Sequence, residues 1–464
     1  MEEESKLINR RFYMVCLAIV MIIFTVTSGV PVIPKLIQTF ELTAGYALWP
    51  QGIFAMAMVI FQPLFGWMSD NYGPKKVGVL GAFIMLFGAI IIAISPALSF
   101  GVAVFGFFLT GVSGAATIPL GFNFIGKIFA EEERGKKLAI MSIIILIGNA
   151  LAPIKGGFFT DAVHWTANYW ASAIFSAIAI YLFAKSLPND TGVKSKFDVG
   201  GAILLLLSLS GLASIPLILN SFGTTTSLWI PSFVIFIISL IVLFIVQKKK
   251  TEPLLDIDYV TNRHFWVPAA IVLFTNAINV GTLYLLTFYI QDIQGKPSTI
   301  VGILQMLFFV ATAVGSYLSG KAIARFSARR TMSSGTLLVI AGMGMFIMVN
   351  LDTSVLYFAL SVIVIGLGFG ILGPARKTIV LSEANLARIG VTTFTFSTAE
   401  NTISNIGGSF VILTYTMLVV SKGASAVSTT ALILTLVALV ALLFMPLIPN
   451  NVVGFQGKKN SAKM

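Results

Sequence analysis

The sequence predicts an all-α fold: a polytopic membrane protein with 14 transmembrane helices, built as two six-helix bundles with two extra helices between them. Three observations lead to this prediction. Of the 464 residues, 57% are hydrophobic and only 10% are charged, whereas soluble proteins carry about 25% charged residues. The apolar residues form 14 runs of membrane-crossing length, and the two longest polar linkers flank the seventh and eighth runs. A chain this apolar could not cover its exterior in water, so a soluble fold is excluded.

The position of each helix follows from the length of its apolar run, because a helix needs about 20 apolar residues to cross a hydrocarbon core of about 30 Å. The first six runs lie at residues 12–36, 44–69, 77–98, 100–128, 138–160 and 167–187. The other eight lie at residues 199–221, 228–247, 265–290, 299–324, 331–350, 354–379, 391–420 and 424–449. The first run lacks a small-residue cleavage site, so we expect it to remain as a helix rather than to act as a signal peptide.

The distribution of basic residues predicts the orientation. With the N-terminus placed inside, 26 of the 30 Lys and Arg residues fall on the inner side, Arg376 among them, and three fall outside. Because cytoplasmic loops collect Lys and Arg, we expect a multi-pass protein of the cell membrane with both termini in the cytoplasm. The net charge of +12 is then a topology signal. A nucleic-acid partner is therefore not expected.

The two long polar linkers divide the chain into three parts. We expect an N-terminal six-helix bundle over residues 1–190, the two extra helices with their linkers over 191–260, and a C-terminal six-helix bundle over 261–464. None of the linkers is large enough to form a soluble domain. The function is therefore expected to take place within or across the bilayer.

Few residues are available for enzyme or cofactor chemistry. The single cysteine, Cys16, lies inside the first apolar run, so neither a disulfide framework nor a cysteine zinc site can form. The two histidines, His164 and His264, fall in loops on opposite sides of the membrane. Without a histidine cluster the sequence predicts no metal site and no cofactor, and it disfavours an enzyme.

The thirteenth run carries an acidic residue near the middle of the bilayer. Glu400 lies about a dozen residues into this run, and Thr393, Ser397, Ser404 and Gly408 follow the same helical face at spacings of three and four. A charge at this depth is costly and marks a candidate functional site. We expect Glu400 to be protonated reversibly or to pair with a cationic substrate, and the alternative is a structural, hydrogen-bonded glutamate.

Other polar residues in or near the spans complete the candidate set for proton coupling and substrate binding. Lys155 lies in the fifth run, on nearly the same face as a stripe of small residues, and it is equally consistent with a functional role and with snorkelling to the outer interface. The remaining candidates lie on the same helices or near the outer ends of the fifth and ninth runs: Asp161, Asp292, Asn401 and Asn405.

The loop between the second and third runs resembles the cytoplasmic signature of the major facilitator superfamily. Its matching residues are Gly66, Asp70, Gly73, Lys75 and Lys76. We expect the glycine at position 66 to allow close helix approach and Gly73, before Pro74, to make a tight turn. The resemblance implies that Asp70 acts as a charge-and-dipole latch that closes the cytoplasmic side; the alternative is topology and turn chemistry alone. A degenerate copy at 320–330 is consistent with a duplicated half.

Further motifs resemble the fourteen-helix drug:proton antiporter branch of this superfamily, which includes multidrug, tetracycline and quaternary ammonium efflux proteins. The fifth run carries an antiporter-like motif made of Gly148, Ala152, Pro153, Gly156 and Gly157. Segments at 252–265, 289–295 and 407–409 also resemble this branch. Two positions depart from it: Thr25 replaces an acid in the first run, and the arginine of the fourth-run motif is missing from the segment that contains Thr110.

The resemblance and the residues together predict a secondary active transporter. We expect proton-coupled antiport, by alternating access, of amphipathic cationic or zwitterionic drugs or metabolites, which would confer antibiotic resistance. A carrier of organic anions or amphipathic lipids without efflux-type proton coupling is the alternative, and a membrane enzyme or sensor is the third possibility. The expected partners are a small-molecule substrate, protons and the lipid bilayer, and the protein is expected to be a monomer.

Overall fold

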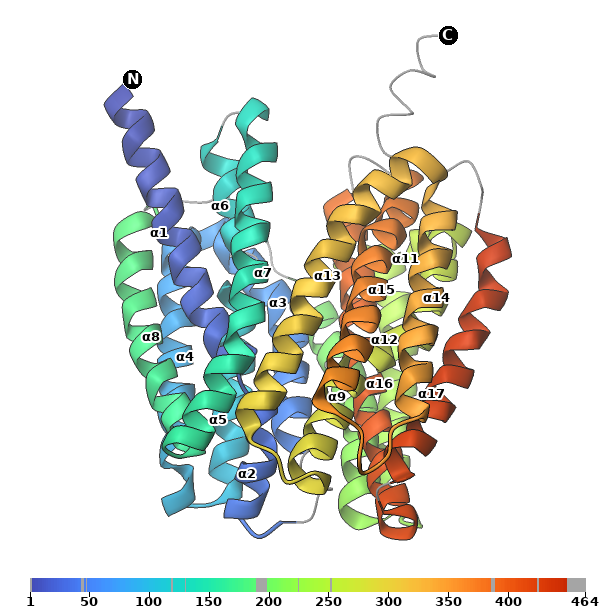
Figure 1. Ribbon diagram of the computed structural model, residues 1–464. Helices are drawn as coiled ribbons and strands as arrows, with labels where there is room; N and C mark the ends of the chain where they lie inside the picture. Colours follow the sequence, from blue (N-terminus) through green and yellow to red (C-terminus); the bar gives the residue numbers. More distant parts are fainter. Residues whose placement is uncertain are drawn as a thin grey trace. The chain divides into compact units, whose positions relative to one another are not determined.

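The computed structural model confirms the all-α fold and the predicted number of membrane-crossing helices. It describes residues 2–42, 46, 48–117, 120–129, 131–188, 198–223, 225–250, 253–384, 389–423 and 425–448. Within these ranges there is no β-strand, and 14 helices are long and apolar enough to cross a membrane. Figure 1 shows these helices, coloured along the chain.

Two compact units divide the helices: Met1–Leu209 with Lys296–Met306, and Ser210–Gly295 with Leu307–Met464. The first unit contains α1 (Glu2–Val26), η1 (Val30–Val32), α2 (Ile33–Thr39), α3 (Leu48–Tyr72), α4 (Pro74–Ile94), η3 (Ser95–Ala97), α5 (Phe100–Thr117), α6 (Leu120–Ile128), α7 (Glu131–Ala162) and α8 (Trp165–Ser186). The first predicted run is thus broken into α1, η1 and α2. The fourth run is divided between α5 and α6.

The remaining helices belong wholly or largely to the second unit. They are α9 (Val199–Phe222), α10 (Trp229–Lys248), α11 (Ile257–Val260), α12 (Arg263–Phe288), the π-helix η4 (Tyr289–Ile293), α13 (Ser298–Phe326), α14 (Ala328–Ile347), α15 (Val355–Ser382), α16 (Ile389–Lys422), α17 (Ser425–Phe444) and η6 (Met445–Leu447). The first residues of α9 and of α13 group with the first unit. The predicted boundaries at residues 190 and 260 stay a prediction.

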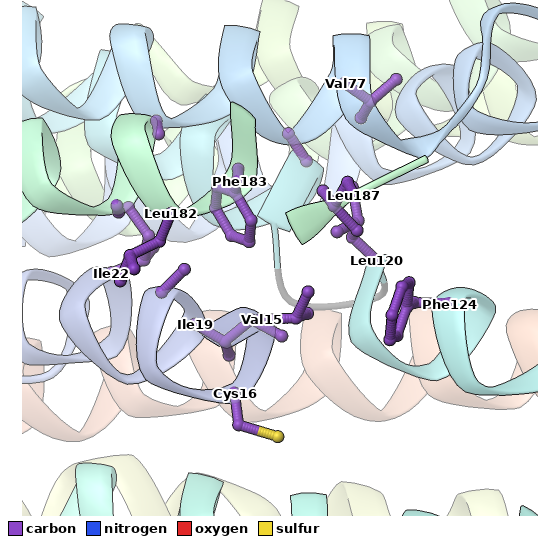
Figure 2. Close-up of a cluster of buried hydrophobic side chains, with 14 of the residues drawn as sticks. Val15, Cys16, Ile19, Ile22, Val77, Leu120, Phe124, Leu182, Phe183 and Leu187 are labelled. Atoms are coloured by element: carbon purple, nitrogen blue, oxygen red, sulfur yellow. The ribbon is translucent and has the colours of Figure 1, made fainter. Parts of the chain in front are cut away.

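The core of the first unit lies between α1, α4, α6 and α8. Ile19 of α1, Val77 of α4, Phe124 of α6 and Phe183 of α8 are almost fully buried in one apolar cluster (Figure 2). Small residues let neighbouring helices approach closely, as expected in a bilayer where packing replaces the hydrophobic effect. For example, a side chain at Gly111 of α5 would overlap the backbone of α3. Because the helices pack this closely, a buried polar side chain has to find its hydrogen-bond partner within the same unit.

A repeated backbone feature supports the predicted duplication. Gly73, which precedes α4, has φ 86° and ψ 153°, and Ser327, which precedes α14, has φ 104° and ψ 152°. Both lie at the end of a long helix and at the start of the next, in the two stretches that the sequence comparison paired. Positive φ favours glycine, so Ser327 keeps a conformation that its side chain disfavours. The second copy retains the turn of the first without retaining its glycine.

Candidate functional site

Glu400 does not stand alone in the membrane, because it forms an ion pair with Arg376. Glu400 is the twelfth residue of α16, and Arg376 lies six residues before the end of α15. Their Oε1 and Nη2 atoms are in direct contact, and the two side chains are only 12% and 8% exposed. The sequence analysis names no counter-ion for Glu400, and the structure supplies one.

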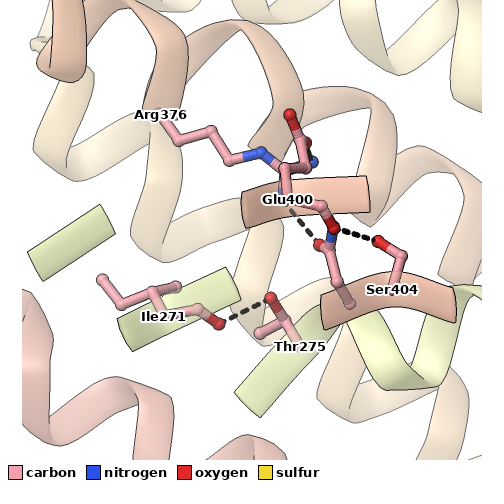
Figure 3. A network of polar contacts seen from close by, with 6 residues as sticks. Ile271, Thr275, Arg376, Glu400 and Ser404 are labelled. Atoms are coloured by element: carbon pink, nitrogen blue, oxygen red, sulfur yellow. Dashed lines mark hydrogen bonds and ion pairs between the residues drawn. The ribbon is translucent and has the colours of Figure 1, made fainter. Parts of the chain in front are cut away.

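Two further polar side chains connect the pair to a third helix (Figure 3). Arg376 Nη1 donates to Oδ1 of Asn276 on α12 at 2.7 Å, and Asn276 Nδ2 donates to Ser404 Oγ at 2.7 Å. Ser404 Oγ in turn donates to the backbone carbonyl of Glu400 at 2.8 Å. The network thus closes on itself through α12, α15 and α16. These hydrogen bonds hold the two charges in a defined geometry.

Sequence reasoning missed Arg376 and Asn276 as parts of this site. Arg376 was counted among the cytoplasmic basic residues, although it falls three residues inside the predicted run 354–379. In the structure Arg376 is buried, and its Nε atom has no hydrogen-bond partner among the described residues. An inventory of charges inside the predicted runs would have found it. Asn276 carries no charge, so no comparable signal marks it.

The other residues of the predicted polar face of α16 have different surroundings in the structure. Ser404 belongs to the network, and a side chain at Gly408 would overlap Val280 of α12. This part of the polar face therefore packs against a helix instead of lining an open cavity. Asn401 is partly buried. The side chains of Thr393 and Asn405 lie outside the described residues.

A second polar site surrounds Lys155 on α7. Its Nζ atom donates to Ser172 Oγ at 2.7 Å and lies 3.4 Å from the Asn168 carbonyl, both on α8. The ring centroid of Phe175 lies 5.5 Å away. Lys155 is seven residues from the end of α7 and Ser172 is seven residues from the start of α8, so the ammonium group stays at the depth of its own backbone. The ammonium group therefore contacts the neighbouring helix α8.

Asp161, near the end of α7, binds the start of α13 instead of the polar sites inside the helices. Its Oδ1 accepts from the Ser298 amide at 3.0 Å, and its Oδ2 accepts from the amide and the hydroxyl of Thr299, both at 2.6 Å. A carboxylate at this position satisfies free amides and interacts favourably with the positive end of the helix dipole. Asp161 is thus a helix cap supplied by another helix. Asp292 is exposed on the π-helix η4 of the other unit.

The antiporter-like motif brings α7 close to two other helices of its unit. A side chain at Gly156 would overlap the backbone oxygen of Ser28, and one at Gly157 would come within 2.5 Å of the Ser298 oxygen. Gly148 faces Ile23 of α1, and Ala152 is fully buried. The backbone oxygen of Pro153 lies against Gly302 of α13. The motif therefore provides close contacts along two sides of α7.

The predicted cytoplasmic loop shows a turn at Gly73 but no close contact at Gly66. A side chain at Gly66 would have no atom of the described residues within 4 Å, so the expected role of this glycine in helix approach stays a prediction. Lys75 is partly buried and Lys76 is exposed, both in the first turn of α4. The Asp70 side chain lies outside the described residues. Its role as a latch stays a prediction.

The two positions that depart from the efflux pattern are neutral and buried. Thr25 is 3% exposed, and its hydroxyl has no hydrogen-bond partner among the described residues. Thr110 is also 3% exposed, and its hydroxyl donates to the carbonyl of Phe107 at 2.8 Å within its own helix. Neither position offers a titratable group. These two positions therefore supply no charge to the described spans, in contrast to the Arg376–Glu400 pair and Lys155.

The comparisons with known sequences identify the family. The family model of the Major Facilitator Superfamily matches residues 15–410. "Multidrug resistance protein 3" of Bacillus subtilis (strain 168) is 23% identical over 331 residues, which cover 69% of this chain but only 63% of that protein. "Quinolone resistance protein NorB" of Staphylococcus aureus (strain MRSA252) is 26% identical over 392 residues, which cover 82% of each chain.

Solved structures of transporters share the fold. The crystal structure of a peptide transporter POT in complex with sulfate has a TM-score of 0.69 at 16% identity and covers 96% of both chains. The human organic anion transporter MFSD10 (TETRAN) has a TM-score of 0.64 at 14% identity and covers 95% of this chain and 99% of that one. These neighbours are transporters and not enzymes, in agreement with the prediction. With a family model matched over most of its length, the chain belongs to the Major Facilitator Superfamily.

Proposed function

We propose that this protein is a secondary active transporter that exports amphipathic cationic or zwitterionic compounds in exchange for protons. The observation that supports this proposal is the buried Arg376–Glu400 pair, held by Asn276 and Ser404. Ionisable groups inside membrane spans are rare and mark ion or substrate pathways. The names of the sequence relatives support drugs, quinolones among them, as the substrate class.

The chemistry of the pair supports exchange. A guanidinium keeps its proton in proteins, so only Glu400 can change its protonation state. Protonation of Glu400 removes its negative charge and breaks the attraction to Arg376. A cationic substrate would compete with both Arg376 and the proton for the same carboxylate. Proton binding and substrate binding then exclude each other, which is the condition for antiport.

The proposed transport cycle is alternating access of two six-helix bundles around a site near the middle of the bilayer. Because Thr25 and Thr110 cannot titrate at neutral pH, Glu400 is assigned the coupling role in this cycle. We further propose residues 1–190 and 261–464 as the two bundles, with residues 191–260, which include α9 and α10, outside the transport pathway. Both termini are placed in the cytoplasm, and the transporter works as a monomer.

A carrier of organic anions is the second candidate function, and Lys155 is the observation that favours it. Its ammonium group has only neutral contacts among the described residues. Membrane potential, at about 2.3 kcal/mol per charge per 100 mV, could drive an anion without proton exchange. The two candidates predict opposite results in the same transport assay.

The test uses proteoliposomes with an imposed pH gradient and a pH-sensitive dye. Addition of tetraphenylphosphonium, a lipophilic cation, is expected to release protons from vesicles that contain wild-type protein, and Glu400→Gln is expected to abolish this release. Glu383→Gln is the matched control, because Glu383 is an exposed carboxylate at the end of α15. Proton release that persists in Glu400→Gln would remove Glu400 from the coupling role. Voltage-dependent passage of a labelled amphipathic anion, with no response to cations, would support the anion carrier instead.

A further inference from the structure

We infer that Lys155, Ser172 and Asn168 form a carboxylate-binding subsite between α7 and α8, which recognises the acidic group of a zwitterionic substrate. This inference rests on the proposed export function and narrows its substrate class. The site lies in the first unit, whereas the Arg376–Glu400 pair lies in the second. The carboxylate subsite is formed entirely by residues of the first unit.

The ammonium group of Lys155 is held in place within the helix bundle. Ser172 Oγ accepts from Lys155 Nζ at 2.7 Å and itself donates to the Asn168 carbonyl at 2.8 Å, which fixes the orientation of the hydroxyl. The same carbonyl lies 3.4 Å from the ammonium group. Phe175 faces the ammonium group with its ring and can stabilise the charge through a cation–π interaction. These contacts position a cation but leave its charge uncompensated.

The charge of Lys155 has no counter-ion in the part of the chain that the structure describes. The nearest acidic residue on α7, Asp161, is engaged by the first turn of α13. Glu400, in the other unit, is paired with Arg376. A desolvated charge without a partner is strongly unfavourable. An anionic group of a ligand would therefore serve as the counter-ion of Lys155. A single ammonium group matches a singly charged carboxylate.

Two residues on the helix that Lys155 contacts have buried polar atoms without hydrogen-bond partners among the described residues, which supports a ligand site rather than a purely structural contact. Asn168 is fully buried, yet neither Nδ2 nor Oδ1 of its side chain has a hydrogen-bond partner among the described residues. The same is true of the hydroxyl of the neighbouring Tyr169, which is 1% exposed. Buried polar groups are nearly always paired, so each unpaired one requires an explanation. The Asn168 amide is thus an unused donor on α8, one turn before Ser172, which is available to an acidic ligand group.

The test compares two ligands that differ only in the carboxylate. Norfloxacin carries a free carboxylate and a basic amine, and its ethyl ester keeps the amine but lacks the acid. Equilibrium dialysis with the purified full-length protein measures the dissociation constant of each. Lys155→Met is expected to weaken norfloxacin binding by at least about tenfold, as expected for the loss of a charge-assisted hydrogen bond. Ester binding is expected to change by less than about twofold, within the error of such a comparison.

Two further variants distinguish an effect of the positive charge of Lys155 from a general disturbance of the fold. Lys155→Arg keeps the positive charge and is expected to retain most of the preference for the acid over the ester. Ser176→Ala removes a hydroxyl of α8 that, among the described residues, donates to the Ser172 carbonyl alone, so it should leave both ligands unaffected. Equal weakening of acid and ester in Lys155→Met, or no weakening of either, would overturn the subsite.

The same variants distinguish failure of the subsite from failure of the export function. Export of tetraphenylphosphonium, which has no carboxylate, is expected to be equal in wild-type protein and in Lys155→Met. If wild-type protein moved neither this cation nor norfloxacin in proteoliposomes, the export function would be wrong. The dialysis measurement would still decide the carboxylate preference in that case.

Discussion

Arg376 and Glu400 are linked twice, once through their side chains and once through Asn276 and Ser404, which lead back to the Glu400 carbonyl. Each of the two buried charges is therefore compensated by the other. Removing one partner of a buried pair leaves an uncompensated charge, whereas removing both leaves none. The pair therefore predicts a specific pattern of stability in a mutant cycle.

Arg376→Met is expected to destabilise the protein by about 3–5 kcal/mol, because Glu400 is left buried and unpaired. The double variant Arg376→Met with Glu400→Gln should recover part of this loss, because its site contains no charge. The measurement is the apparent melting temperature of the purified protein in detergent. A double variant less stable than Arg376→Met alone would contradict the coupling.

The close contact of α7 with Ser28, in the turn between α1 and η1, predicts a difference between two Gly→Ala substitutions. Gly156→Ala should destabilise the protein by about 1–3 kcal/mol, since its new methyl group would overlap the Ser28 backbone and force the helices apart. Gly66→Ala is the matched control, because there is no atom within 4 Å of its added carbon. Yield of folded protein and apparent melting temperature check both. Equal losses in the two variants would show that the helix contact does not carry the effect.

The cap that Asp161 supplies predicts faster opening of the first turn of α13. Asp161→Asn keeps the shape of the side chain but removes its charge and one acceptor, and loss of a cap costs about 1 kcal/mol. Hydrogen–deuterium exchange of the Ser298 and Thr299 amides should therefore be several-fold faster than in wild-type protein. Asp292→Asn, an exposed carboxylate near the same chain segment, serves as the control. Unchanged exchange in Asp161→Asn would mean that the cap does not hold this turn closed.

Tyr259, outside the membrane spans, predicts a loss of stability at alkaline pH. Its hydroxyl donates to the Val380 carbonyl at 2.6 Å, and burial, followed by the charge of Glu383, raises the pKa of Tyr259 to about 12. An unfolded tyrosine has a pKa of about 10. The neutral side chain therefore stabilises the fold fully below pH about 10, and this contribution is lost as the pH rises towards 12. Tyr259→Phe should be less stable than wild type at neutral pH, and the difference in melting temperature should vanish by pH about 12.

The helices were largely predictable because a membrane imposes a length on every apolar run. The tenth run, 299–324, and the observed α13, Ser298–Phe326, differ by only a few residues. The break after α1 was missed, since Pro31 and Pro34 interrupt the first run without making it less apolar. Apolar length locates a span but does not report where its backbone is interrupted.

The candidate site was only half predictable. Glu400 was found because a carboxylate in an apolar run is conspicuous. Its partner Arg376 was not, because arginines near span ends also report topology, and Asn276 lies 100 residues from Arg376 along the chain. Which neutral amide faces which charge depends on helix rotation and packing, and neither can be read from a single sequence.

Gly73 and Ser327 have nearly the same backbone dihedral angles, and this similarity bears on the predicted duplication of the two halves. A motif search that requires both the glycine at the turn and the acid would reject the second copy, because serine replaces that glycine and the acid is lost. A search that compares dihedral angles would pair the two positions at once. The predicted duplication is therefore seen more clearly in the backbone dihedral angles of these two turns than in the residues of the two motif copies.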